Sequence, residues 1–108
     1  MAGVGNGSPT ATVESTIDGS RASVIRISGE LDLASVPGIE SEIQPAIEAA
    51  PERVVFDLSG ITFMDSSGIA MLLRVAKRVA EVEVRDPSAA VRLIIEATGL
   101  ADVLRVKP

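Results

Sequence analysis

Residues 53–70 read RVVFDLSGITFMDSSGIA, and this stretch decides the fold. Residues 53–58 are almost continuously apolar, which predicts a strand buried on both faces, in the middle of a sheet with parallel neighbours. A connection, residues 59–68, leads directly into a helix expected from about Ser66 to Ala80, where apolar residues recur at helical spacing. A buried strand followed at once by an amphipathic helix indicates an α/β domain.

Further strand candidates extend this unit in both directions. Residues 12–17 and 22–28 are rich in Val, Ile and Thr and flank an Asp-Gly turn signal in residues 18–21, which predicts an antiparallel hairpin. Residues 81–85 and 103–106 are shorter candidates, expected near a sheet edge. We therefore expect a mixed sheet of about four to five strands, opened by the hairpin and packed against about three to four helices.

The segment between the hairpin and the buried strand carries a helical stripe. Ser35 and Pro37 fit the start of this helix. Pro45 predicts a kink or an early end, because proline removes a backbone donor and clashes with the preceding turn. The apolar stripe consists of Val36, Ile39, Ile43 and Ile47.

A last helix is expected over residues 87–98. Asp86 would cap it, Pro87 would take its first position, and Gly99 would follow its end. No glycine separates the helix that begins near Ser66 from the strand at residue 81, so either that helix ends early or the strand starts late. The apolar face of the last helix is expected to consist of Val91, Leu93, Ile94 and Ile95.

Composition excludes much of enzyme chemistry. The chain has 108 residues, a formal net charge of -5, and neither His nor Cys, which removes thiol and imidazole catalysis, disulfides and the usual ligands of transition metals. Ten basic against fifteen acidic residues, without a dense basic run, argue against nucleic-acid binding. We expect no cofactor and no metal.

Residues 1–10 are expected to form a flexible tail before a single domain, residues 11–108. The tail lacks the basic start and apolar run of a signal peptide. No apolar run approaches the roughly 20 residues that cross a bilayer. The sequence therefore predicts a cytoplasmic protein without membrane contact, mostly monomeric, with a weak dimer as the alternative.

The hydroxyl cluster at residues 65–68 is the most unusual local feature. Asp65 or Ser66 can accept backbone N–H groups at the helix start, and Ser67 falls in the first turn. Gly68 would leave the backbone uncovered for close approach by another molecule. Taken alone, this chemistry favours a well-capped helix over a binding site.

Residues 63–69, FMDSSGI, resemble the signature of the STAS-domain anti-sigma factor antagonists, bacterial regulators that switch partner by serine phosphorylation. Three further stretches agree in order and spacing: GELD at residues 29–32, VVFDL at residues 54–58, and AVRL at residues 90–93 leading to Gly99. The resemblance covers nearly the whole chain from residue 12 onward. It implies a single STAS domain.

The resemblance also implies a function. The unphosphorylated protein would bind an anti-sigma factor, commonly a kinase with a histidine-kinase-like ATP-binding fold, and so release the sigma factor. Phosphorylation at Ser66 would switch binding off, and a phosphatase would restore it. Glu30 and Asp32 match family positions close to the contact surface, and both are equally well explained as solvated turn residues. The partner-binding residues implied are Glu30, Asp32, Asp65, Ser66, Ser67 and Gly68.

Other interpretations remain open. A catalytic serine would need a base, and no glycine stands two residues before Ser66 to make a nucleophile elbow, so we expect no enzyme activity. The cations Arg74, Lys77 and Arg78 form either a solvated helix face or a docking rim for an acidic partner. The alternative function is that of a non-catalytic STAS subunit of a lipid-transport ABC complex.

Overall fold

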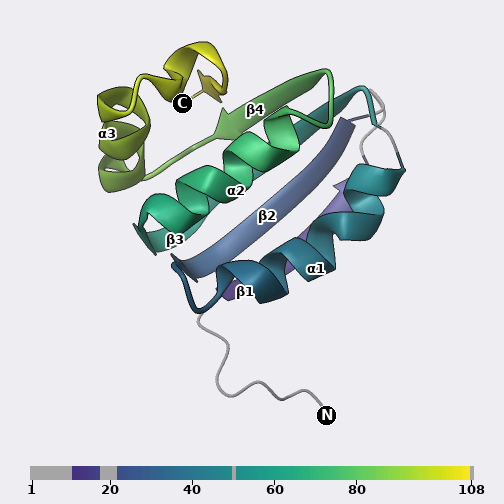
Figure 1. The fold of residues 1–108 in the computed structure, drawn as a ribbon, viewed down its shortest axis with the longest axis horizontal. Coiled ribbons are helices and arrows are strands. Elements are labelled where there is room, and N and C mark those ends of the chain that lie inside the picture. The colour runs from purple at the N-terminus through teal and green to yellow at the C-terminus, as the bar shows by residue number, and fades with distance from the viewer. Residues whose placement is uncertain (1–10, 18–21, 50, 108) are drawn as a thin grey trace.

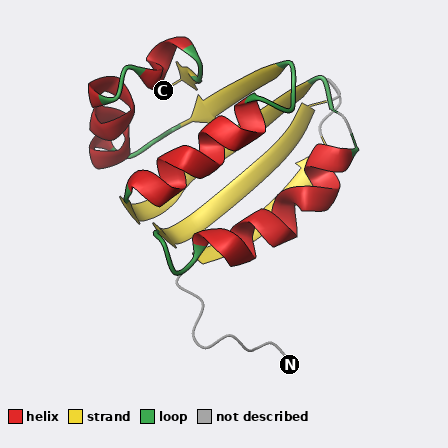
Figure 2. Cartoon of the chain, in the orientation of Figure 1, coloured by secondary structure: helices red, strands yellow, loops and turns green. Residues whose placement is uncertain are grey.

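The computed structural model describes residues 11–17, 22–49 and 51–107. Within them one five-stranded sheet lies behind two long helices, and a third helix follows the fourth strand (Figures 1 and 2). The elements are β1 (Ala11–Ile17), β2 (Ala22–Leu31), α1 (Val36–Glu48), β3 (Arg53–Met64), α2 (Ser66–Ala76), β4 (Glu81–Arg85), α3 (Ala89–Ala97), the 3-10 helix η2 (Leu100–Asp102) and β5 (Arg105–Lys107).

The strand order is β1-β2-β3-β4-β5, and only β1 runs antiparallel to its neighbour. The hairpin predicted at the start of the domain is therefore confirmed, with Val13 opposite Ile27; its connection, residues 18–21, lies outside the described residues. β4 is not an edge strand, because β5 pairs with it. The mixed α/β architecture expected from the sequence is confirmed.

The apolar patterns read from the sequence form a single core. Val54, Val55 and Phe56 are completely buried, as expected for a strand covered on both faces. All four members of the predicted stripe on α1 are buried. Helix α1 continues past Pro45 to Glu48, so the predicted early end is wrong: Ile43 and Ile47 hold both sides of the proline in the core, and Ala49 donates to the Pro45 carbonyl at 3.1 Å.

The prediction that residues 59–64 form a connection is wrong, because β3 continues to Met64. The strand continues because β2 also extends beyond the predicted end, so that Glu30 pairs with Phe63 and Leu31 with Met64. Two irregularities in the β2–β3 register accompany this extension, and Gly29 adopts a φ of 104° between them. The conformation of residues 59–64 therefore depends on pairing partners far away in the chain.

Helix α2 ends at Ala76 rather than at Ala80. Its last turn tightens: Arg78 donates to the Val75 carbonyl at 2.9 Å, three residues back. Residues 77–80 form the turn, and β4 begins at Glu81 as predicted. The boundary that the sequence left open is thus resolved by an early helix end.

Helix α3 differs from its prediction at the start and on one face. Ser88, not Asp86, is the N-cap, and its Oγ accepts from the Val91 N–H at 3.3 Å. Asp86 adopts a φ of 51° and donates its N–H to the Lys107 carbonyl, which joins β4 to β5. Leu93 is 66% exposed, because it lies two positions from both Val91 and Ile95, which face the core.

The last strand also begins later than predicted. Residues 103–106 were expected to form it, whereas β5 covers Arg105–Lys107. The preceding residues form η2, and Val103 follows this 3-10 helix with half of its surface exposed. Leu104 is completely buried and anchors the turn to the core.

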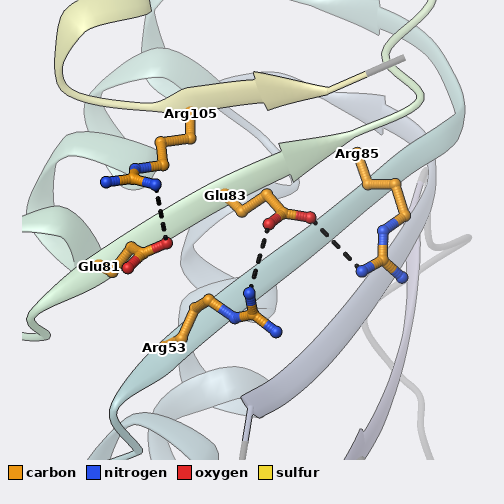
Figure 3. Close-up of polar contacts among 5 residues, drawn as sticks. All are labelled: Arg53, Glu81, Glu83, Arg85 and Arg105. Atoms are coloured by element: carbon orange, nitrogen blue, oxygen red, sulfur yellow. Dashed lines mark hydrogen bonds and ion pairs between the residues drawn. The ribbon is translucent and has the colours of Figure 1, made fainter. Parts of the chain in front are cut away.

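The face of the sheet opposite α1 and α2 carries a charged cluster on β3, β4 and β5 (Figure 3). Glu83, whose side chain is only 5% exposed, lies between Arg53 at 3.7 Å and Arg85 at 3.4 Å. Arg105 pairs with Glu81 at 3.6 Å. Because alternate side chains of a strand point to opposite faces, β4 contributes Val82 and Val84 to the core and these charges to the other side.

Candidate functional site

The candidate site lies where β2 and β3 end side by side. Leu31 and Met64 are paired at this end, and the Asp65 N–H donates to the Leu31 carbonyl at 3.0 Å. From here the chain enters α1 and α2, whose first turns lie at the same edge of the sheet (Figure 1). The fold thus brings the GELD and MDSSG segments of the sequence together.

Asp65 fixes the start of α2. Its backbone is extended, and its Oδ1 accepts from the Ser67 N–H at 2.8 Å, while its carbonyl accepts from the Gly68 N–H at 3.1 Å. Of the two capping residues that the sequence allowed, Asp65 is the cap. Ser66 is the first residue of the helix and is exposed. Its hydroxyl is therefore presented from a rigid backbone.

Gly68 is buried inside the protein. A Cβ atom at this position would lie 2.8 Å from Met64 Cγ and 3.0 Å from Leu31 Cβ. The expectation that Gly68 leaves its backbone uncovered for another molecule is wrong, because the chain's own strand ends occupy that space. Glycine is required here so that α2 can pack closely on β2 and β3.

Glu30 and Asp32 lie at the same edge but differ in role. Asp32 Oδ1 accepts from the N–H groups of Ala34 at 3.1 Å and Ser35 at 2.9 Å, so its carboxylate holds the turn that leads into α1. Glu30 is exposed, and its carbonyl accepts from Ser35 Oγ at 2.7 Å. The turn interpretation therefore accounts for the side chain of Asp32 and not for that of Glu30.

Sequence reasoning did not assign two exposed apolar residues at this edge to the site. Leu33, in the turn before α1, is 77% exposed, and Phe63, near the end of β3, is 49% exposed. Alternation from the buried Met64 would have placed Phe63 outward. No sequence signal marked Leu33. Exposed large apolar side chains beside a polar cluster are typical of interaction surfaces.

Two of the three cations in and just after α2 contact α1. Arg74 Nε donates to Glu40 at 2.7 Å, and Arg78 donates to Gln44 at 3.0 Å. The hydrogen bond from Arg74 to Glu40 raises the pKa of Arg74 above its ordinary value. The first contact joins α2 to α1, the second joins the turn after α2 to α1, and all four residues line the crevice between the two helices. The docking-rim interpretation stays untested.

The side chains at this edge of the sheet include several acidic groups. Glu30, Asp32 and Asp65 contribute three carboxylates, and the described part of the chain contains no group of three His, Cys, Asp or Glu side chains placed to hold a metal ion. The arrangement can present a hydroxyl, two apolar side chains and negative charge to another molecule. These features fit a protein-binding surface.

Comparison with known proteins places this arrangement in a family. Residues 10–108 match the STAS domain. The chain is 34% identical over 82 residues, 71% of its length and 70% of the relative, to an anti-sigma F factor antagonist of Lysinibacillus sphaericus. The chain belongs to the STAS-domain anti-sigma factor antagonist family.

Solved structures agree with this assignment. An anti-sigma factor antagonist from Mycobacterium paratuberculosis is 28% identical and superposes with a TM-score of 0.83, covering 91% of this chain and 86% of that one. The antagonist SpoIIAA in its unphosphorylated form shares the fold, with 24% identity, a TM-score of 0.74, and coverage of 90% of this chain and 89% of that one.

Among the described residues of this STAS domain, no helix is long and apolar enough to cross a membrane.

Proposed function

We propose that this STAS domain binds an anti-sigma factor through the edge formed by the ends of β2 and β3, and that phosphorylation of Ser66 abolishes this binding. The anti-sigma factor would be a kinase with a histidine-kinase-like ATP-binding fold that modifies Ser66, and a phosphatase would reverse the modification. Binding would release the sigma factor and so permit transcription. The domain itself would act without catalysis.

The observation that carries this proposal is the position of Ser66. Ser66 is exposed as the first residue of α2, directly after the cap in which Asp65 accepts from the Ser67 N–H. A kinase needs an accessible hydroxyl, and a switch needs a modification that leaves the fold intact. A phosphate at a helix N-terminus meets the positive end of the helix dipole, so α2 can tolerate the roughly -1.5 to -2 charges that a phosphate carries.

The partner would experience the modification differently. Glu30, Asp32 and Asp65 already make the edge negative, so a complementary partner would present cations around apolar pockets for Leu33 and Phe63. A phosphate would add bulk in the centre of that contact and bring a further charge next to Asp65. The loss of a few kcal/mol would weaken binding by about two decades or more.

The direct test is incubation with candidate anti-sigma kinases and ATP, followed by mass spectrometry that maps the modified residue. We expect one phosphate, located on Ser66 and absent in Ser66→Ala. Ser67→Ala, which keeps the adjacent hydroxyl, is the matched control and should still be modified. Modification of Ser67 instead, or of neither serine by any kinase that binds the domain, would contradict the proposal.

Binding provides the second measurement. Ser66→Ala should bind the anti-sigma factor as tightly as the parent, and Ser66→Asp should bind at least about tenfold more weakly. Equal affinity of Ser66→Asp and the parent would overturn the switch. Recovery of an ATPase and a permease with the domain, rather than a sigma-binding kinase, would favour the transport alternative.

A further inference from the structure

Helix α3 presents an apolar face that nothing in the described part of the chain covers. Leu93 lies at the centre of this face and is 66% exposed, and three exposed alanines surround it: Ala89, Ala90 and Ala97. Val91 and Ile95 fix the opposite side of the helix in the core. The face is therefore rigidly oriented outward, and its small side chains allow another helix to approach closely.

Two charges border the same face. Arg92 and Glu96 lie one turn apart on α3, and at about 100° per residue both fall on one side of Leu93, while Ala90 and Ala97 fall on the other. Neither Arg92 nor Glu96 takes part in any ion pair formed among the residues that the structure describes. The border thus offers one cation and one anion to an outside partner.

We propose that this face binds the same face of a second copy, with the two α3 helices antiparallel about a twofold axis. A twofold interface requires a surface that is complementary to itself. Reversal of the helix direction brings Arg92 of one copy opposite Glu96 of the other, and the symmetry repeats the pair. The two Leu93 side chains then pack against each other between the alanines.

The size of the face determines the strength of the association. A nine-residue helix spans only about 13 Å. Stable complexes bury about 800 Å² on each partner, which exceeds what one short helix supplies. The dimer is therefore weak and forms at high protein concentration. The α3 interface is independent of the function proposed for Ser66, because it involves a different helix and no modification.

Sedimentation velocity on the full chain tests the interface, over concentrations from about 10 μM to about 1 mM, where weak dimers form. We expect the weight-average sedimentation coefficient to rise toward that of a dimer. Leu93→Glu should remove the rise while circular dichroism stays unchanged. Leu33→Glu is the matched control, since Leu33 is 77% exposed on a different element, and it should dimerise like the parent.

Charge exchange tests the antiparallel geometry. Arg92→Glu and Glu96→Arg should each weaken dimerisation about tenfold, because each places like charges opposite one another. The double variant R92E/E96R should recover parental dimerisation, since the exchanged pair is again complementary. A monomer at every concentration, a dimer that survives Leu93→Glu, or no recovery in the double variant would overturn the proposal. The proposal would also be overturned if the parent is monomeric and Leu93→Glu loses binding to the anti-sigma factor, because α3 would then serve that partner.

Discussion

Gly68 of α2 packs directly against Leu31 at the end of β2. A Cβ atom on Gly68 would lie 3.0 Å from Leu31 Cβ and 3.3 Å from the Leu31 carbonyl oxygen. The helix that presents Ser66 therefore packs closely on the strand that carries Glu30, because glycine has no side chain of its own at this contact. This contact determines how the two halves of the candidate site lie relative to each other.

Gly68→Ala should lower the free energy of unfolding by about 1–3 kcal/mol, because the added methyl group overpacks the contact with Leu31 and Met64. The measurement is chemical denaturation. Gly38→Ala in α1 is the control: a Cβ atom there meets nothing within 4 Å, and the substitution should stabilise by up to about 1 kcal/mol through helix propensity. A neutral Gly68→Ala would show that the contact relaxes without cost.

Glu83→Gln should destabilise the domain by about 1–3 kcal/mol, because it leaves Arg53 and Arg85 without the carboxylate that they share. Both arginines are partly exposed, at 33% and 40%, so water limits the loss. The more exposed pair of Glu81 with Arg105 supplies the control, and Glu81→Gln should cost less than about 1 kcal/mol. Equal losses in the two variants would contradict a special role for the buried carboxylate.

Asp57 should contribute pH-dependent stability. Burial acts to raise the pKa of Asp57, but hydrogen bonds from Ser59, with Arg26 and Arg85 nearby, outweigh it and hold the pKa below its ordinary value of 3.8. A lowered pKa stabilises the folded state above pH 3.8, and this contribution disappears as the pH falls through the folded-state pKa.

Asp57→Asn should therefore be less stable than the parent at pH 7, by less than about 1 kcal/mol, and the difference should vanish in acid. Thermal unfolding of both proteins, from pH 7 down to below pH 3.8, measures this difference in stability. Glu42→Gln, an exposed change on α1, is the control for the loss of one negative charge. A difference for Asp57→Asn that persists unchanged in acid would exclude the charge as its cause.

Leu33→Ala and Phe63→Ala should each weaken binding to the anti-sigma factor about tenfold or more, if that surface is the docking edge proposed above. Both side chains are largely exposed, so the melting temperature should change little. Calorimetric titration measures the affinity. Val103→Ala, which truncates another half-exposed apolar residue, is the control and should bind like the parent. Unchanged affinity in both test variants would show that Leu33 and Phe63 are not part of the interface.

The helical stripes and the buried strand could be predicted because their causes are local. Val36, Ile39, Ile43 and Ile47 recur at the period of a helix, and all four are buried as the pattern predicted. The Asp65 cap depends on groups within the first turn. Patterns of this kind require only the neighbouring residues.

Local patterns mispredict the segments whose burial depends on residues far away in the chain. Residues 59–64 are expected to form a connection, yet they pair with the extended end of β2 and become strand. Leu93 resembles a core residue, yet Val91 and Ile95 turn it outward. Whether a helix continues through Pro45 likewise depended on the core contacts of Ile43 and Ile47.

The sequence by itself determined the class of fold, the helix start that presents Ser66, and the family to which the chain belongs. Only the tertiary structure decided that Gly68 serves internal packing, that Asp32 holds a turn, and that Leu33 and Phe63 remain exposed at the same edge. The physical reason is the distance along the chain over which each kind of interaction acts. Capping and periodicity act over a few residues of one segment, whereas close packing and exposure are set by segments that meet only after the sheet has formed.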